Sequence, residues 1–122
     1  MESHGELDLE WRDNLLVLNL MGPFNEEGAI DAFNHLKQSV ISKKTNEWMR
    51  LEVWNEGTLG SPEVMEGIRQ LFSWCVENGC IATAVVVSNR VQKMIAEKEL
   101  PEDVEVFNDV SDAMEWINKL NF

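Results

Sequence analysis

The sequence predicts a single α/β domain built on a mixed, mostly parallel sheet of about five strands with about four helices. Two patterns indicate this fold class. Short apolar stretches with strand periodicity alternate with longer stretches that have helical periodicity, and polar caps, glycines or prolines separate them. The predicted order is strand–strand–helix–strand–helix–strand–helix–strand–helix. Each helix between two of the later strands serves as a crossover that keeps those strands parallel.

The first two strands are expected to form an antiparallel hairpin after a flexible tail of residues 1–6. Leu7, Leu9 and Trp11 alternate with polar side chains, which is typical of a strand with one buried face. Asp13-Asn14 is a turn candidate, and residues 15–20 form a nearly continuous apolar strand. The single domain is therefore expected to span residues 7–122, with its first strand near a sheet edge.

A first helix is predicted after Gly22-Pro23, which ends the second strand. Asn25 is its expected N-cap, because an asparagine side chain accepts a hydrogen bond from the first turn. His35 falls on the polar face, where we expect it to be solvated. On a 3.6-residue wheel the predicted buried face consists of Ala29, Ile30, Phe33, Leu36, Val40 and Ile41.

Residues 48–54 have the alternation of a strand, and a glycine-containing loop then leads to a second helix. Ser61, Pro62 and Glu63 supply a serine N-cap, a proline at the first helical position and an acid in the first turn. Gly79 is expected to end this helix as a left-handed cap. The wide apolar face of the helix comprises Val64, Met65, Ile68, Leu71, Phe72, Cys75 and Val76.

Two further strand–helix pairs complete the predicted fold. Residues 81–87 are almost entirely apolar, which predicts a strand covered on both faces. The third helix is capped by Ser88 or Asn89 and ends before Pro101. Residues 104–107 form the last strand, and Asn108 or Ser111 caps the final helix. The expected buried positions are Val91, Met94 and Ile95 in the third helix, and Ala113, Met114, Ile117 and Leu120 in the fourth.

The formal net charge of −12 argues against nucleic acid and anionic membrane surfaces as partners, because such a field repels phosphate groups. No apolar stretch approaches the roughly 20 residues that span a bilayer. The first residues have neither the basic nor the apolar region of a signal peptide. Cys75 and Cys80 are expected to be free thiols in a reducing compartment. We therefore expect a cytoplasmic protein without membrane insertion.

The most acidic part of the sequence lies near its C-terminal end. Between Glu97 and Glu115 there are eight acidic residues and one base, Lys98. A solvated surface that aids solubility explains this composition, and a docking face for a basic protein partner is the alternative.

Catalytic chemistry is not expected, because no combination of residues suits it. The two histidines, His4 and His35, are predicted in the tail and on a polar helix face, so a nucleophile and base are hard to assemble. The sequence has no P-loop and no Gly-x-Gly-x-x-Gly motif. The four residues between Cys75 and Cys80 do not match the usual zinc spacing. We predict no catalytic residues, no cofactor and no metal site.

Three stretches resemble the SpoIIAA-like branch of the STAS superfamily, a branch of small, mostly uncharacterised bacterial proteins. STAS is the fold of the bacterial anti-sigma-factor antagonists. The stretches are residues 48–65, residues 81–87, and Val104-Glu105-Val106-Phe107 with the later Asp112-Ala113-Met114-Glu115-Trp116-Ile117. The third is similar to that branch's closing strand and its helix with an Ala-x-x-Trp-Leu pattern. The resemblance implies a STAS-like fold over nearly the whole chain and a non-enzymatic regulatory or protein-interaction role.

Ser61 and Thr58 are the candidate phosphoacceptors that follow from this resemblance. The anti-sigma-factor antagonists carry an Asp-Ser-Ser/Thr-Gly motif between the third strand and the next helix. Here that place reads Glu56-Gly57-Thr58-Leu59-Gly60-Ser61-Pro62, and the motif is absent. Ser61 suits a simple helix cap, and it also suits a phosphoacceptor at the positive end of the helix. Glu63 and Glu66 would repel such a phosphate.

Trp74 is the candidate centre of a ligand or partner surface. It is one of five tryptophans, and it falls outside the buried arc of the second helix, beside Gly67 and with Leu71 at its near edge. A protein partner or a homodimer contact explains this position, and so does the margin of the core. A pocket for a small apolar ligand or lipid tail is a further alternative. The resemblance implies it loosely, because the branch is sometimes grouped by shape with the CRAL-TRIO lipid-transfer fold.

Overall fold

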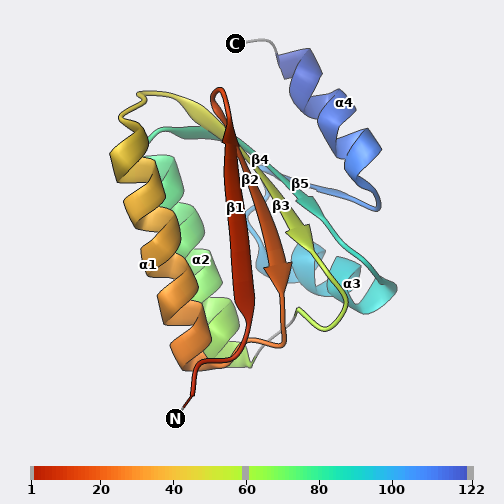
Figure 1. Cartoon of the computed structure of the whole chain (residues 1–122). Helices are drawn as coiled ribbons and strands as arrows, with labels where there is room; N and C mark the ends of the chain where they lie inside the picture. The colour runs from red at the N-terminus through yellow and green to blue at the C-terminus, as the bar shows by residue number, and fades with distance from the viewer. Residues whose placement is uncertain (1, 59–60, 121–122) are drawn as a thin grey trace.

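A computed structural model describes residues 2–58 and 61–120 and contains a five-stranded sheet with helices on both faces (Figure 1). The predicted order of elements is confirmed. The elements are β1 (Glu6–Arg12), β2 (Leu15–Met21), α1 (Glu26–Lys43), β3 (Trp48–Trp54), α2 (Pro62–Glu77), β4 (Cys80–Val86), α3 (Arg90–Glu99), β5 (Val104–Phe107) and α4 (Val110–Leu120).

The strands lie in the sheet in the same order as in the sequence, β1-β2-β3-β4-β5. The hairpin strands β1 and β2 are antiparallel, with Trp11 opposite Leu16. The pairs β2–β3, β3–β4 and β4–β5 are parallel, because each connection passes through a helix. The predicted mixed sheet and the edge position of the first strand are thereby confirmed, and β3 is the central strand.

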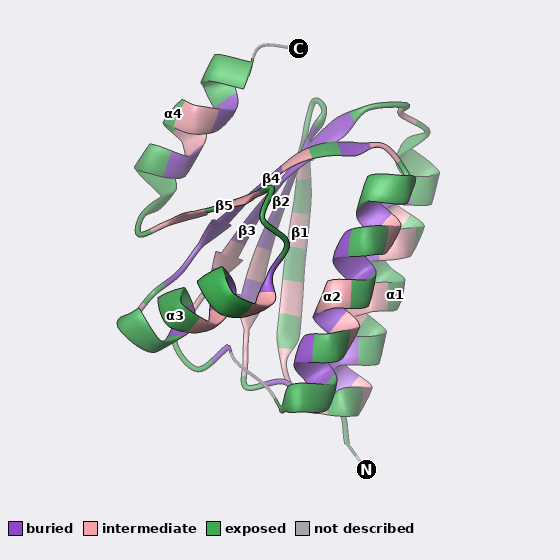
Figure 2. Cartoon of the chain, turned by 180° about the vertical axis from the view of Figure 1, so that it is seen from behind, coloured by how far each residue is buried: buried purple, intermediate pink, exposed green. Residues whose placement is uncertain are grey.

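The sheet is covered unequally on its two faces (Figures 1 and 2). One apolar cluster joins α1 and α2 to the sheet and includes Ala96 and Leu100 at the end of α3. A second, smaller cluster packs Ala113 and Ile117 of α4 against the opposite face. Since β3 lies between these layers, six of its seven residues are buried.

The helices begin where polar caps and proline predict. Asn25 accepts a hydrogen bond from Gly28 N at 2.8 Å, and Asn89 accepts one from Gln92 N at 2.8 Å. The fourth helix differs from the prediction of Asn108 or Ser111, because Asp109 accepts the bond from Asp112 N at 2.8 Å. Gly79 has a φ of 101°, a left-handed conformation that suits glycine after α2.

The buried face of α3 is not the predicted one. Val91 and Met94 are exposed, Ile95 is half-buried, and Gln92 and Ala96 face the core. Two hydrogen bonds of the Gln92 side chain explain this orientation of α3. Its Nε2 donates to the Asn55 carbonyl at 2.8 Å, and its Oε1 accepts from Ser88 N at 2.8 Å. These bonds turn Gln92 inward and direct the apolar stripe outward. Four other residues predicted in buried faces are exposed as well: Ile30 and Ile41 of α1, Val76 of α2 and Leu120 of α4.

The N-terminal residues contact the start of α1. Asn25 Nδ2 donates to the Glu2 carbonyl at 2.7 Å, and Ser3 Oγ donates to Asp31 Oδ2 at 2.6 Å. The first strand begins at Glu6, within the range that we assigned to a flexible tail. His4 and His35 are both exposed, as their predicted positions indicated.

Candidate functional site

The connection from β3 to α2 lies at the carboxyl end of the parallel strands, where α/β sheets commonly bind ligands. Its first residues pack closely against the β2–α1 connection. A side chain at Gly22 would come within 2.8 Å of the Thr58 backbone, so glycine is required for this approach. Leu59 and Gly60, which continue the connection, lie outside the described residues.

Thr58 is a structural residue of this connection. It is buried, and its hydroxyl lies 2.8 Å from the Leu20 carbonyl and 2.5 Å from the Asn55 carbonyl. A phosphate could not be added without breaking these contacts and opening the loop. Thr58 therefore fixes the loop to the end of β2, and of the two candidate phosphoacceptors only Ser61 has an exposed side chain.

Ser61 is the N-cap of α2, which is the first of the two roles that the sequence predicts for it. Its side chain accepts a hydrogen bond from Val64 N at 3.3 Å, its backbone is extended, and Pro62 begins the helix. Ser61 is exposed to solvent. The nearby Glu66 is paired with Arg69, which also bonds to Glu99 of α3 at 2.5 Å. This pairing offsets part of the negative charge close to the cap.

The space beside Gly67 is filled by the protein itself. A side chain at Gly67 would lie 2.8 Å from the ring of Phe33, because α1 and α2 approach each other there. Leu71 is buried in the apolar cluster under both helices. The absence of a side chain at Gly67 thus leaves room for the Phe33 ring of α1, and Leu71 belongs to the core.

Trp74 is half-buried at the outer edge of the same helix pair, in agreement with its predicted place outside the buried arc. The ammonium of Lys37 lies 5.7 Å from the centre of its ring, in the range of a cation–π contact. Ile41 and Ile30 lie one and two turns from Lys37 on the same side of α1. They are 65% and 57% exposed. We call Ile30, Lys37, Ile41 and Trp74 the α1–α2 surface.

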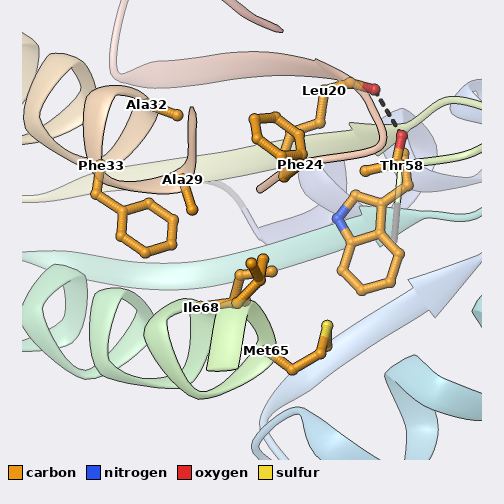
Figure 3. A pocket seen from close by; sticks show the side chains of 10 residues that line it. Leu20, Phe24, Ala29, Ala32, Phe33, Thr58, Met65 and Ile68 are labelled. Atoms are coloured by element: carbon orange, nitrogen blue, oxygen red, sulfur yellow. Dashed lines mark hydrogen bonds between the residues drawn. The ribbon is translucent and has the colours of Figure 1, made fainter. Parts of the chain in front are cut away.

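An apolar pocket lies between α1, α2 and the end of β3 (Figure 3). Phe33 and Ala29 from α1 point toward Ile68 and Met65 from α2, and Thr58 closes one end. The cavity volume is about 20 Å³, and an adjoining cavity beside Leu36 also measures about 20 Å³. A water molecule needs roughly 10–15 Å³ on this measure. These cavities are therefore far too small for a lipid tail in this conformation.

A buried polar cluster, which the sequence analysis missed, lies on the α2 side of the central strand. Arg50 of β3 is 1% exposed. Its Nη1 donates to Cys75 Sγ at 3.2 Å and its Nη2 to Thr83 Oγ1 at 3.4 Å, while its guanidinium carbon lies 3.8 Å from the Phe72 ring centre. A signal was present in the sequence, because Arg50 shares a strand face with two tryptophans that a domain of this size must bury.

Glu52 is the counter-charge of this cluster. It is 2% exposed, its Oε2 lies 3.9 Å from Arg50 Nε, and its Oε1 accepts a 2.7 Å hydrogen bond from Trp54 Nε1. Within the described part of the chain, Arg50 Nε has no hydrogen-bond partner. Burial raises the pKa of the neighbouring Cys75 thiol to about 11, although Arg50 opposes the rise. Cys75 is thus a protonated, unreactive thiol at neutral pH.

Among residues 2–58 and 61–120, no group of three or more histidine, cysteine or acidic side chains is arranged to hold a metal ion. Within the same residues, no helix combines the length and the apolar character needed to cross a membrane. Cys75 and Cys80 are both free and buried.

Comparisons with known proteins support the fold. No protein-family model matches the sequence, and no curated protein matches it. A solved structure of similar fold is that of an uncharacterized protein from the DUF3478 family with a SpoIIAA-like fold, from Shewanella loihica PV-4. It is 15% identical, the match covers 95% of each chain, and the TM-score is 0.63. The expected SpoIIAA-like fold is confirmed.

Proposed function

We propose that the protein is a non-enzymatic, SpoIIAA-like interaction module that binds a protein partner or a second copy through the α1–α2 surface. The exposure of this surface is the observation that carries the proposal. Trp74 is half-buried, with the Lys37 ammonium over its ring, and the two isoleucines of the α1–α2 surface are more than half exposed. Tryptophan flanked by aliphatic side chains is typical of the energetic centre of protein interfaces.

The cavity volumes favour surface recognition over the alternative of a small apolar ligand or lipid tail. The two apolar cavities between α1 and α2 have room for little more than water, since Phe33 occupies the space beside Gly67. A lipid tail would have to separate the two helices. The exposed α1–α2 surface needs no such rearrangement to bind another protein.

Ser61 is the proposed regulatory residue of the module. It is exposed, it lies at the positive end of α2, and Arg69 is held one turn beyond Glu66. Phosphorylation of Ser61 would remove the hydroxyl that caps α2, but the phosphate oxygens would meet the backbone N–H groups of the same first turn. This role would add to the capping function and does not depend on a catalytic site.

Site-specific photo-crosslinking in the protein's own host tests the proposal. Ile41→benzoylphenylalanine places the crosslinker on the α1–α2 surface, and Ile81→benzoylphenylalanine places it on an exposed isoleucine outside that surface. We expect a discrete crosslinked product from position 41 and not from position 81, and we expect Trp74→Ala to remove it. Equal crosslinking from both positions, or none from position 41, contradicts the proposal.

A further inference from the structure

A cleft lies between α2, the strands β4 and β5, and the connection from α3 to β5 (Figure 2). Its cavity volume is about 330 Å³, far larger than the two cavities of about 20 Å³ between α1 and α2. Small-molecule sites commonly measure roughly 300–1,000 Å³. Phe72 of α2 and Val104 of β5 supply apolar walls. The cleft therefore has room for one small molecule.

The charged groups that line this cleft are separated by depth. Arg50 and Thr83 are 1% and 7% exposed, so they form the floor of the cleft. Glu77 of α2 and Asp103 of the α3–β5 connection are exposed, so they lie at its mouth. Within residues 2–58 and 61–120, neither of these two carboxylates forms an ion pair. The cleft thus has positive charge at its floor and negative charge at its mouth.

The guanidinium of Arg50 has more donor capacity than its neighbours use. It carries five N–H donors, and its two hydrogen bonds go to the Cys75 thiol at 3.2 Å and the Thr83 hydroxyl at 3.4 Å. Sulfur is a weak acceptor, and 3.4 Å is long for an N–H···O bond. The Glu52 carboxylate lies 3.9 Å from Nε and does not line the cleft. Buried donors with so few acceptors favour a ligand that supplies another acceptor.

Thr83 connects the buried Arg50 to the cleft. Its hydroxyl oxygen accepts the bond from Arg50 Nη2, so the hydroxyl proton can be donated to a second acceptor. The Cys80 sulfur lies 3.4 Å from the same oxygen and is a weak acceptor. A carboxylate oxygen in the cleft would be a stronger one, and the Arg50 charge strengthens Thr83 as its donor because linked hydrogen bonds polarise one another.

We propose that this cleft binds a small zwitterion of the amino-acid class with an aliphatic side chain. The ligand carboxylate accepts the hydrogen bond from Thr83, and the ligand ammonium lies near Glu77 and Asp103. The aliphatic side chain packs against Phe72 and Val104. A simple anion would meet the acids at the mouth, and a simple cation would meet the positive floor. The arrangement therefore selects a molecule that carries both charges.

This inference does not depend on the proposed function, because no residue of the α1–α2 surface lines the cleft. Binding of a zwitterion and binding of a protein partner can therefore be measured separately. Failure of either one leaves the other unaffected.

Titration of the isotope-labelled protein with L-leucine, followed by two-dimensional NMR, tests the proposal. We expect saturable shifts of the Thr83 and Val104 amide signals. Two analogues are matched probes: isocaproate lacks the ammonium of leucine, and isoamylamine lacks its carboxylate. Each analogue should bind at least about tenfold more weakly than leucine, because each leaves one end of the cleft without its partner.

Two substitutions test the two ends of the cleft. Thr83→Val removes the hydroxyl and should weaken leucine binding about tenfold, whereas Thr83→Ser should retain it. Asp103→Asn should weaken leucine binding about fivefold. Asp8→Asn makes the same chemical change on β1, at the opposite edge of the sheet, and should leave binding unchanged. Asp103 is exposed, so Asp103→Asn should keep the melting temperature of the parent protein and tests the mouth even if Thr83→Val unfolds.

Several results would overturn the proposal. One is the absence of saturable shifts at millimolar leucine, and another is binding of either analogue as tightly as leucine. Unchanged leucine binding in Asp103→Asn would exclude the acidic mouth as the ammonium site. Equal weakening by Asp103→Asn and Asp8→Asn would show that the attraction is nonspecific. Leucine-induced shifts confined to Phe33 and Ile68 would place the ligand between α1 and α2 instead.

Discussion

Replacing Glu52 by glutamine should be one of the most destabilising isosteric changes available in this protein. The variant keeps the size of the side chain and an oxygen that can accept the hydrogen bond from Trp54 Nε1. It removes only the negative charge 3.9 Å from Arg50 Nε. Because Arg50 is 1% exposed, its charge would remain buried without a counter-ion. Removing one partner of a buried pair costs about 3–5 kcal/mol of unfolding free energy.

Urea unfolding of Glu52→Gln measures this loss, and two variants provide the controls. Glu66→Gln makes the same chemical change in a pair whose side chains are 36% and 54% exposed, so the expected loss is below about 1 kcal/mol. The double variant Arg50→Met/Glu52→Gln removes both charges and should recover most of the stability lost in Glu52→Gln. A loss below about 1 kcal/mol for Glu52→Gln, or no recovery in the double variant, would refute the account of this cluster.

Three further predictions concern single side chains. Ser61→Ala should lower the unfolding free energy by about 1 kcal/mol, whereas Ser61→Asp should be nearly neutral, because aspartate also caps helices; thermal melts that show no difference between the two contradict the capping role. Stability should be full below pH 9 and fall by about 2–3 kcal/mol as the pH rises through 11, because the folded protein raises the pKa of Cys75 from 9.0 to about 11. Urea titrations at pH 9 and at pH 11 measure this fall in unfolding free energy. Cys75→Ala should reduce the fall, and an unchanged fall in that variant refutes its assignment to the Cys75 thiol. Trp74→Ala should cost clearly less than the roughly 3–5 kcal/mol expected for a core tryptophan, and outright unfolding would place Trp74 in the core.

The order of elements along the chain and most helix starts could be predicted because they depend on local chemistry, whereas the order of the strands within the sheet was not predicted. Alternation identified the hairpin, and crossover helices imposed the parallel pairing of the later strands. The caps Asn25, Ser61 and Asn89 followed from side chains that bond to their own first turns. Asp109 was missed because several polar residues precede α4 and periodicity does not choose among them.

The orientation of α3 could not be predicted from periodicity, because tertiary hydrogen bonds decide it. A wheel favours Val91 and Met94 as the buried stripe, yet Gln92 faces inward to bond with two neighbouring loops. The buried pair of Arg50 and Glu52 was missed for a similar reason. Charged side chains are buried here only because β3 is central and α2 supplies Phe72 and Cys75 above it.

The candidate site was predicted in part. Ser61 was correctly predicted as a cap on the second helix, and Trp74 was correctly placed outside the buried arc of that helix. Sequence spacing could not show that Phe33 fills the space beside Gly67, because the contact joins two helices. Nor could it show that Thr58 bonds to the Leu20 carbonyl, a residue of a neighbouring strand.

Native mass spectrometry of the protein purified from its own host tests the central claim, recognition of a protein through the α1–α2 surface, most directly. It reports stoichiometry, bound ligand and phosphorylation in one measurement. We predict a mass that corresponds to the chain bound to another protein chain or to a second copy, and we predict that Trp74→Ala releases the monomer. A monomer that carries a small apolar molecule, with the same spectrum for Trp74→Ala, would contradict the claim and favour the ligand-binding alternative.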